Sequence, residues 1–374
     1  MIEIREVKNS AEIRRFIEFP LKLYKDNPYF TPPLYGDEKK MFKKNFVYAD
    51  TCESIFLNAY KDGKHCGRIQ GIIQRAANEK NNEKRVRFTR FDSVNDDGVA
   101  EALFNAVEKW ALSKGMDTVA GPLGYSDLER EGLLIEGFDQ NSTFEEQYNF
   151  EYYASLIENR GYVKEVDWVE STVRLPEGGM DPRVFAIEER LLKRYDLHYG
   201  TAKNTNEFLK KYADPFFGLL DRSYENIYGT VPFTEGMKKM MIDNFRLIID
   251  LRFVHVLLDK SEKVVALGIC FPAIGDALKK SGGRLTPAAI IKVLKAAKKP
   301  EVIDFGLIGV DPDLINLGIG AAMVAGVARM MSENGIRHAE TNLNLEDNDA
   351  IRGMWKYFDS TENKRRRCFV KKLT

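Results

Sequence analysis

The sequence predicts an α/β fold made of two consecutive units of similar length, and three observations support this. The chain has 374 residues, more than twice the about 150 residues of an average domain. Apolar residues make up 44% of the chain and charged residues 30%, as in globular proteins with a buried core. Runs that alternate like strands are interspersed with stretches of helical periodicity, in a similar order in each half.

The chain opens with an expected strand at residues 2–7, followed by a helix. The helix is indicated by four apolar residues with a period of 3.6, which are Ile13, Phe16, Ile17 and Leu21. Pro20 is expected to kink this helix or to end it. Residues 24–42 hold three prolines and five aromatic residues, which favours an extended strap over a helix. The strap either packs over the core or forms one wall of a binding cleft.

The rest of the first half shows a hairpin and further strands and helices. Asp62 and Gly63 separate two apolar runs within residues 54–76, which is a strong hairpin signal. An amphipathic helix is expected at residues 96–115, with Gly115 as its C-cap. The other elements expected here are strands at 86–94, 116–124 and 162–175 and a helix at 150–161.

The second half repeats this order approximately. A hairpin is expected around Asp259 to Lys263. The other expected elements are strands at 197–203, 300–310, 336–345 and 364–373 and helices at 206–229, 233–249, 277–299, 318–335 and 349–358. Gly178 and Gly179 stand between two prolines in the manner of a linker. We therefore predict domains at 1–178, which includes the aromatic and proline-rich strap, and at 179–374.

Charge and motif content exclude several classes of protein. The 56 Lys and Arg residues balance 56 Asp and Glu residues, so no overall field attracts DNA. The four cysteines and four histidines show neither metal-ligand spacing nor a hydrolase motif, so we expect no disulfide and no metal. The N-terminus does not read as a signal peptide, and no window has about 18 uninterrupted apolar residues. A cytoplasmic protein without membrane association is expected.

The stretch from Leu307 to Met331 carries the clearest functional signal. A strand leads into a proline-containing turn, and Gly318 and Gly320 then open a helix rich in Ala, Val and Met. Small residues at a helix start allow an anion to approach the unpaired backbone N–H groups, which suits a diphosphate. The alternative is a tight turn with close helix-to-strand packing.

These residues resemble the GNAT superfamily of acyl-CoA N-acyltransferases. In that pattern a Q/R-x-x-G-x-G/A loop follows a strand, and an N-x-x-A-like segment later leads to a helix carrying a Tyr. Both glycines match here, with Ile315 at the Gln/Arg position, and the later segment corresponds to residues 346–350, with Trp355 at the Tyr position. The resemblance covers the second half and, without the glycine loop, extends to residues 50–175.

The resemblance implies two tandem GNAT-like domains, each a mixed, mostly antiparallel sheet flanked by helices, with the N-terminal one degenerate. It implies acetyl-CoA as co-substrate, bound by the C-terminal domain without a metal. Backbone groups of a strand would hold the pantetheine, and the loop the diphosphate. The residues expected in these roles are Ile308, Gly309, Val310, Asn316, Leu317, Gly318, Ile319, Gly320, Ala321 and Asn348, the last of which also stands at an expected helix N-cap.

Amine acylation needs a base that takes a proton from the ammonium group. Glu340 is the first candidate and Asp304 the second, both on expected strands, where a structural salt bridge is the alternative explanation. Tyr357 is a candidate acid in place of the missing Tyr, although its helical position turns it away from Trp355.

The function implied is acetyl transfer from acetyl-CoA to a small-molecule amine or a peptide. Two alternatives stay open. Ile315 and Trp355 favour a non-catalytic binding protein on the same fold, and the basic segment at residues 277–299 favours an aminoacyl-tRNA-dependent transferase. An acidic loop with Glu131, Glu136 and Asp139 is explained either by turn chemistry or as the acidic wall of a substrate cleft.

Overall fold

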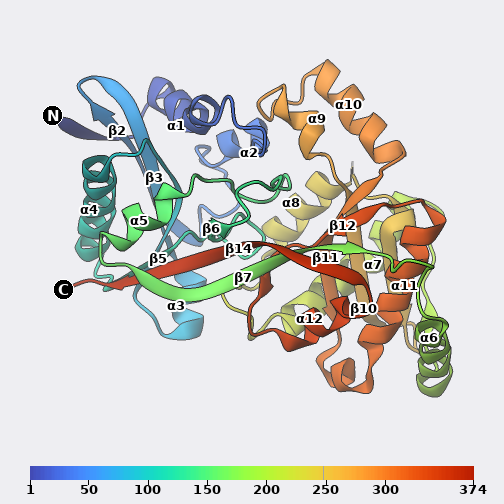
Figure 1. Cartoon of the computed structure of the whole chain (residues 1–374). Coiled ribbons are helices and arrows are strands. Elements are labelled where there is room, and N and C mark those ends of the chain that lie inside the picture. Colours follow the sequence, from blue (N-terminus) through green and yellow to red (C-terminus); the bar gives the residue numbers. More distant parts are fainter. Residues whose placement is uncertain (247) are drawn as a thin grey trace. The chain divides into compact units, whose positions relative to one another are not determined.

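The computed structural model describes residues 1–246 and 248–374 (Figure 1). Internal contacts divide the chain into two compact units, and each is described by itself. The first unit comprises Met1–Val169, Ile274–Val293 and Asn363–Thr374, and the second comprises Glu170–Ala273 and Leu294–Glu362. Since these units combine non-consecutive segments, the domain boundary after residue 178 stays a prediction.

The first unit is a mixed sheet flanked by helices, with strand order β1-β2-β3-β4-β5-β14-β7 and β6 paired with β14. Its strands are β1 (Ile2–Glu6), β2 (Cys52–Lys61), β3 (Lys64–Gln74), β4 (Arg85–Ser93), β5 (Thr118–Gly121), β6 (Leu133–Glu136) and parts of β7 (Val163–Arg174) and β14 (Asp359–Lys372). Its helices are α1 (Ser10–Leu23), α2 (Tyr35–Lys40), α3 (Arg75–Asn81), α4 (Asp97–Ser113), α5 (Tyr152–Glu158), α9 (Gly275–Lys279) and the start of α10 (Pro287–Lys298).

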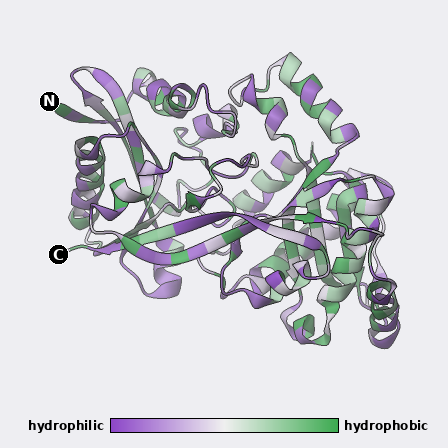
Figure 2. Ribbon diagram, viewed as in Figure 1, coloured by the Kyte–Doolittle hydropathy of each residue, from purple (hydrophilic) through white to green (hydrophobic). Residues whose placement is uncertain are grey.

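Local sequence explains the best-predicted elements of this unit. Asp62 and Gly63 have φ values of 50° and 77°, the left-handed pair that a two-residue hairpin turn between β2 and β3 needs. Helix α4 has Asp96 as its N-cap, whose side chain accepts a hydrogen bond from the N–H of Val99, and it ends before Gly115, which has a φ of 72°. Apolar and polar residues alternate along α4 with helical spacing (Figure 2), and its apolar side is buried in the core.

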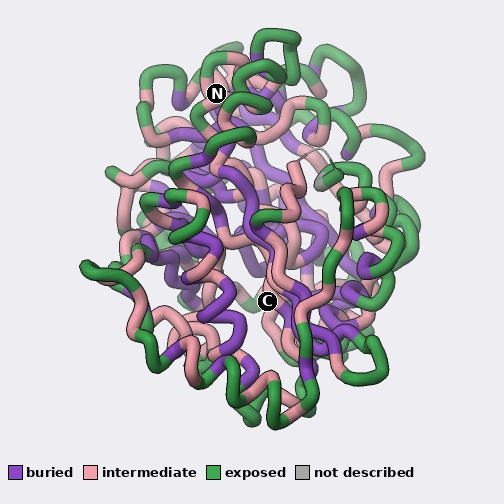
Figure 3. Tube along the Cα trace, turned by 90° about the vertical axis from the view of Figure 1, so that its right-hand side faces the viewer, coloured by how far each residue is buried: buried purple, intermediate pink, exposed green. Residues whose placement is uncertain are grey.

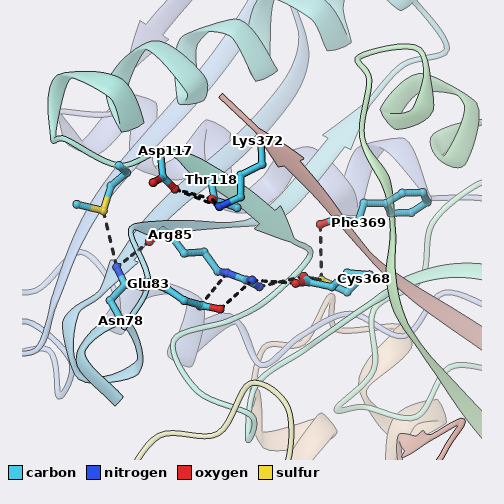
Figure 4. A network of polar contacts seen from close by, with 10 residues as sticks. Asn78, Glu83, Arg85, Asp117, Thr118, Cys368, Phe369 and Lys372 are labelled. Carbon is cyan, nitrogen blue, oxygen red and sulfur yellow. Dashed lines mark hydrogen bonds and ion pairs between the residues drawn. The ribbon is translucent and has the colours of Figure 1, made fainter. Parts of the chain in front are cut away.

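The C-terminal strand is fastened to the first unit by pairing and by polar contacts. Residues of β14 from Phe369 to Lys372 pair antiparallel with β5. Lys372 Nζ donates to Thr118 Oγ1 at 2.7 Å, and nearby Arg85 pairs with the carboxylate of Glu83 (Figure 4). Arg85 also pairs with the carboxylate of Glu165. The sequence predicts a strand here but assigns it to the C-terminal domain, because pairing over more than 200 residues leaves no local signal.

The second unit is also a mixed sheet with helices, in the order β7-β12-β11-β10-β9-β8. Its elements include α6 (Pro182–Tyr195), β8 (His198–Tyr199), α7 (Thr205–Ser223), α8 (Glu235–Phe245), β9 (Val254–Leu258), β10 (Val264–Pro272) and β11 (Val302–Val310). A 3₁₀ turn (Pro312–Leu317), α11 (Ile319–Glu333), β12 (His338–Glu340), β13 (Asn344–Leu345) and α12 (Asp349–Trp355) follow. Figure 3 shows that buried residues of the described chain lie in the interior, whereas exposed residues lie mainly in the outer loops and turns.

Four sequence predictions about these elements need correction. The strap at residues 24–42 is not extended throughout, because α2 forms within it. Helix α6 was not predicted, although its start has Asp181 as N-cap and proline at the first helical position. The expected helix at 277–299 is two helices, α9 and α10. The expected strand at 336–345 is reduced to β12 and β13. The expected helix at 233–249 is represented by α8, and its Leu247 lies outside the described residues.

Close packing of α11 on β9 gives a prediction about acid stability. A Cβ atom on Gly326 would lie 3.2 Å from Nδ1 of His255, so the imidazole is covered by the helix. Burial, together with the charge of Arg329, which is paired with Glu188, lowers the pKa of His255 to about 4. Between pH 6.5 and 4 the unfolded histidine therefore binds a proton that the folded one does not. Acid should destabilise the protein by up to about 3 kcal/mol through this residue alone.

The measurement is urea unfolding from pH 7 to pH 4 for the protein and for His255→Leu. We expect the stability of the variant to fall less over this range. Parallel pH profiles for the two proteins would contradict the burial of a neutral imidazole.

Candidate functional site

The two parallel strands β11 and β12 of the second unit separate after a short pairing. They pair only over Val302–Asp304 and His338–Glu340, whereas β11 continues to Val310. A bulge at Gly306, opposite the step from Ile269 to Cys270 in β10, bends β11 where the separation begins. Asn342 Nδ2 donates to the carbonyl oxygen of Gly306 at 3.0 Å and spans the gap. The result is a strand pair that opens into a V.

The first unit repeats this geometry. Parallel strands β4 and β5 pair only over Arg85–Arg87 and Thr118–Ala120, and β4 continues to Ser93. A register shift between β3 and β4 lies at Arg90, whose φ is 48°. Both units therefore carry a bulged strand and a parallel strand pair that opens. They share this backbone arrangement although their amino-acid sequences do not repeat.

The predicted strand residues Ile308 to Val310 lie on the open part of β11. The N–H of Asp311 donates to Val265 O of β10 at 2.8 Å, and strand residues alternate, so Gly309 faces β10 while Ile308 and Val310 face the open edge. The carbonyl oxygens of Ile308 and Val310 accept hydrogen bonds from side-chain hydroxyls at the end of α7. Their N–H groups face the side on which no described strand pairs with them. An extended amide chain fits such an edge.

The glycine loop has the conformation that the sequence predicts. Gly318 has φ 83° and is the N-cap of α11, with no side-chain cap among the described residues. A Cβ atom on Gly320 would be 3.7 Å from the Met354 side chain, so this position has room for little more than a methyl group. Asn316, Leu317 and Gly318 are exposed, Ile319 is buried and Gly320 and Ala321 are partly buried. Among the described residues no side chain caps the start of α11, and the N–H of Ala321 already donates to Gly318 O at 2.9 Å.

The acid at the start of this loop is neutralised by two cations. Asp311 accepts a hydrogen bond from Lys263 Nζ at 2.9 Å, and Arg222 Nη2 lies 3.4 Å from the same carboxylate oxygen. Burial alone would raise the pKa of Asp311, but the hydrogen bond and charge of Lys263, with that of Arg222, hold it below its ordinary value. The carboxylate is therefore compensated and does not oppose an anion at the loop.

The corresponding helix of the first unit has a different start. In α4 the Asp96 carboxylate occupies the cap and pairs with Lys61, and the next residue, Asp97, pairs with Arg160. These carboxylates stand where a diphosphate would lie. The second unit is the better candidate for an anion site at its helix start.

The two candidate bases stand side by side. Asp304 of β11 is directly opposite Glu340 of β12, so in these parallel strands their side chains point to the same face. Thr172 Oγ1 donates to Glu340 Oε1 at 2.8 Å, and His338 Nε2 lies 3.4 Å from that oxygen. Asp304 is buried, whereas the side chain of Glu340 is 16% exposed and reaches solvent. Glu340 is therefore the carboxylate better able to exchange protons with water.

Asn344, Asn348 and Trp355 belong to the segment that follows β12, and their contacts connect this segment to itself and to β11. Asn348 caps α12, since its Oδ1 accepts from the N–H of Ile351 at 3.2 Å, which confirms the expected cap. Trp355 stacks on Phe305 with ring centroids 4.9 Å apart, and its Nε1 donates to Asn344 Oδ1 at 3.0 Å. Tyr357 follows the end of α12 and is 45% exposed. Its role as an acid stays a prediction.

An apolar pocket missed by the sequence reasoning lies between helices α7 and α8 and the bulged strands β10 and β11. Its cavity volume is about 30 Å³, and the space in front of it is open to solvent. Its lining is apolar or aromatic: Phe208, Leu209, Tyr212, Ala213, Phe216, Phe217, Met241, Ile242, Ile249, Ile269, Phe271 and Leu307. The hydroxyl of Tyr212 donates to Thr201 O at 3.1 Å and is satisfied there. Phe271 is opposite Asp304 across the β10–β11 pair, so the pocket adjoins the carboxylates.

The described residues show neither a metal-ligand cluster nor a membrane-spanning helix. Residues 1–246 and 248–374 contain no cluster of three or more His, Cys, Asp or Glu side chains that could hold a metal ion. Within the same ranges, no helix is both long and apolar enough to cross a membrane.

The bulged strand, the open parallel pair and the uncapped helix that follows define the second unit as a GNAT fold, and the first unit as a divergent copy of it. Comparison with solved structures agrees. A tandem GNAT protein from the clavulanic acid biosynthesis pathway superposes with a TM-score of 0.54 and 11% identity, covering 100% of this chain and 98% of that protein. The fold class predicted from the sequence is confirmed, with a mixed, mostly antiparallel sheet in each unit.

Among proteins of similar sequence, protein YghO of Escherichia coli K12 is 24% identical over 377 residues, which span 99% of this chain and 95% of YghO. The bacterial ceramide synthase of Caulobacter vibrioides is 24% identical over 306 residues, covering 78% of this chain and 76% of that enzyme. No family model matches the chain.

Proposed function

We propose that the protein is an acyl-CoA-dependent N-acyltransferase whose acceptor is an amine with an apolar chain. The observation that carries the proposal is the apolar pocket beside Asp304 and Glu340, next to the opening of β11 and β12. The donor site, the base and an apolar binding surface thus belong to one unit.

In the proposed donor site the pantetheine amides bind the open edge of β11 at Ile308 and Val310. The diphosphate binds the loop from Asn316 to Ala321, where no described side chain caps the start of α11. Acetyl-CoA is the donor that the sequence predicts, and the length of the acyl group is one variable of the test.

In the proposed chemistry Glu340 takes a proton from the ammonium group of the acceptor, and the free amine attacks the thioester carbonyl. A strand N–H of β11 stabilises the oxygen that becomes negative. The departing CoA thiolate needs little help from an acid, because thiols ionise near about pH 8.5. Trp355 in place of a Tyr is therefore compatible with turnover.

The proposed class of acceptor rests on two observations, which are the apolar pocket and the name of one relative. A ceramide is an amide between a fatty acid and a long-chain amino alcohol, so the Caulobacter relative, by its name, makes an amide on a long-chain amine. An alkyl chain in the pocket of this protein would gain about 0.8 kcal/mol for each methylene that it buries.

The direct test combines purified protein with acetyl-, hexanoyl- and palmitoyl-CoA and with butylamine, dodecylamine and sphinganine. Amide formation by mass spectrometry, together with release of free CoA, would support the proposal if the long-chain amines react best. CoA binding without any amide product would favour a non-catalytic binding protein. Transfer from aminoacyl-tRNA, without CoA binding, would favour the third alternative.

Filling the pocket should separate long from short acceptors. Ala213→Phe places a ring into the pocket, and we expect kcat/KM for dodecylamine to fall about tenfold or more, since burial of several methylenes is lost. The value for butylamine should change little. Gly218→Ala on the same helix is the matched control, because its Cβ atom would be 3.9 Å from the nearest side-chain atom. An equal loss for both amines would contradict the assignment of the pocket to the chain of the acceptor.

A further inference from the structure

A second pocket lies in the first unit, on the strands that correspond to β10 and β11. Its cavity volume is about 20 Å³, and the space in front of it is open to solvent. The strap and the end of α1 provide an apolar wall of Pro20, Tyr24, Phe30 and Pro33. Unlike the pocket of the second unit, its other side is charged, with Glu38, Arg68, Arg90, Asp92 and Arg130. The repeat has thus kept the position of the pocket and changed its chemistry.

Most of these charges are compensated within the unit. Arg68 Nε is 2.8 Å from Asp92 Oδ2, and Arg90 Nη2 is 3.1 Å from Glu38 Oε1. The hydroxyl of Tyr24 donates to Asp92 at 2.9 Å, so only its ring is available to a ligand. These contacts pair the four charged side chains with one another and use the hydroxyl donor of Tyr24.

Arg130 and Gln147 differ from the others. For Arg130, the described residues supply one hydrogen-bond acceptor, the carbonyl oxygen of Phe144 at 2.7 Å, and no carboxylate within ion-pair distance. A guanidinium has five N–H groups, so most of its donor capacity is unused. Gln147 is 8% exposed, and its Nε2 is buried with no partner in the described structure. Both side chains line the pocket.

The charge balance favours a single negative charge. The lining has three guanidinium groups against two carboxylates. Two further acids lie near the lining residues, and each is beside an arginine. Glu129 lies 3.6 Å from Arg90, and Glu146 is 3.3 Å from Arg366. Burial lowers the pKa of Arg130 to about 10, which still leaves it charged at neutral pH. A bound anion would offset the favourable solvation free energy that this guanidinium loses on burial.

We propose that this pocket binds a small monocarboxylate with an apolar tail. The carboxylate accepts hydrogen bonds from Arg130 and Gln147, and the tail packs on the rings of Tyr24 and Phe30. The site is separate from the proposed acyltransferase site and does not depend on it. A dianion such as phosphate has no second uncompensated cation to meet.

The test is isothermal titration of the full-length protein with hexanoate, without CoA. Inorganic phosphate and hexylamine are the control ligands. We expect one saturable hexanoate site per chain. Because a hydrogen bond to a charged group contributes about 1.5–3 kcal/mol, Gln147→Met should weaken binding about tenfold to hundredfold. Its melting temperature should not fall, because the lost amide has no partner.

Arg130→Met should abolish binding, and Arg75→Met on the surface of the same unit should not change it. If Arg130→Met fails to fold, Gln147→Met still decides the question. Absence of saturable hexanoate binding at millimolar concentration would overturn the proposal. Equal affinities of Gln147→Met and the parent protein, or tighter binding of phosphate or hexylamine than of hexanoate, would overturn it as well.

Discussion

Glu340→Gln should lower turnover of a long-chain amine by about a hundredfold to ten-thousandfold, the usual contribution of general base catalysis. The substitution keeps the size and the hydrogen-bond acceptor of the side chain, so the Thr172 hydroxyl can still donate to it. It removes the ability to take a proton from the ammonium group. Affinity for acetyl-CoA should be nearly unchanged, because the proposed donor contacts are backbone groups of β11 and the loop. Steady-state kinetics and calorimetry measure the two quantities.

Variants around Glu340 distinguish a base from a structural carboxylate. Thr172→Val removes the hydrogen bond at 2.8 Å and should reduce turnover by about tenfold, with a changed pH profile, if Thr172 positions the base. Asp304→Asn tests the neighbouring carboxylate, and a larger loss there than in Glu340→Gln would exchange the two roles. An unimpaired Glu340→Gln enzyme would leave Glu340 as part of a structural pair with His338.

The parts of the site that the sequence predicts are those with a local signal. The glycine loop is predictable because Gly318 stands directly before the Ala- and Val-rich helix. A left-handed glycine before a helix is a short-range feature that the sequence shows. Asn348 was recognised as a cap for the same reason. The adjacency of Asp304 and Glu340 follows from parallel pairing of the two strands, which the strand–helix–strand order already suggests.

Long-range features were not accessible from the sequence. The apolar pocket joins α7 residues to β11 residues about 90 positions later, and in the sequence those α7 residues appear as an ordinary buried helix face. The unused donors of Arg130 and Gln147 depend on what surrounds them, which composition does not contain. The sequence prediction lacks α6 for another reason: the Gly178–Gly179 turn resembles a linker, and only the Asp181–Pro182 pair after it signals a helix start.

The divergence of the two units follows from a few side chains on a common backbone. Both have a bulged strand beside a parallel pair that opens, at Gly306 in one unit and at Arg90 in the other. The helix after this strand begins with an open glycine in the second unit and with two aspartates in the first. The pocket on these strands is apolar in the second unit and charged in the first. These differences support the proposal of a donor site in the second unit alone, and CoA bound at α4 would contradict it.

Gly320→Val should weaken binding of acetyl-CoA about tenfold to hundredfold while the protein stays folded. A valine side chain at this second helical residue would extend beyond the Cβ position that already lies 3.7 Å from Met354, and would cover the N–H groups that the diphosphate needs. Loss of one hydrogen bond to a charged group accounts for a change of this size. Valine has a higher helix propensity than glycine, so the melting temperature should not fall.

Gly320→Ala is the matched control and should bind nearly as well as the parent protein, because a methyl group fits the space. Gly318 is unsuitable for this comparison, since its φ of 83° would strain any other residue and unsettle the loop itself. Calorimetry with acetyl-CoA decides the matter: equal affinities of the valine variant and the parent protein, or no binding by the parent, would remove the diphosphate from this loop.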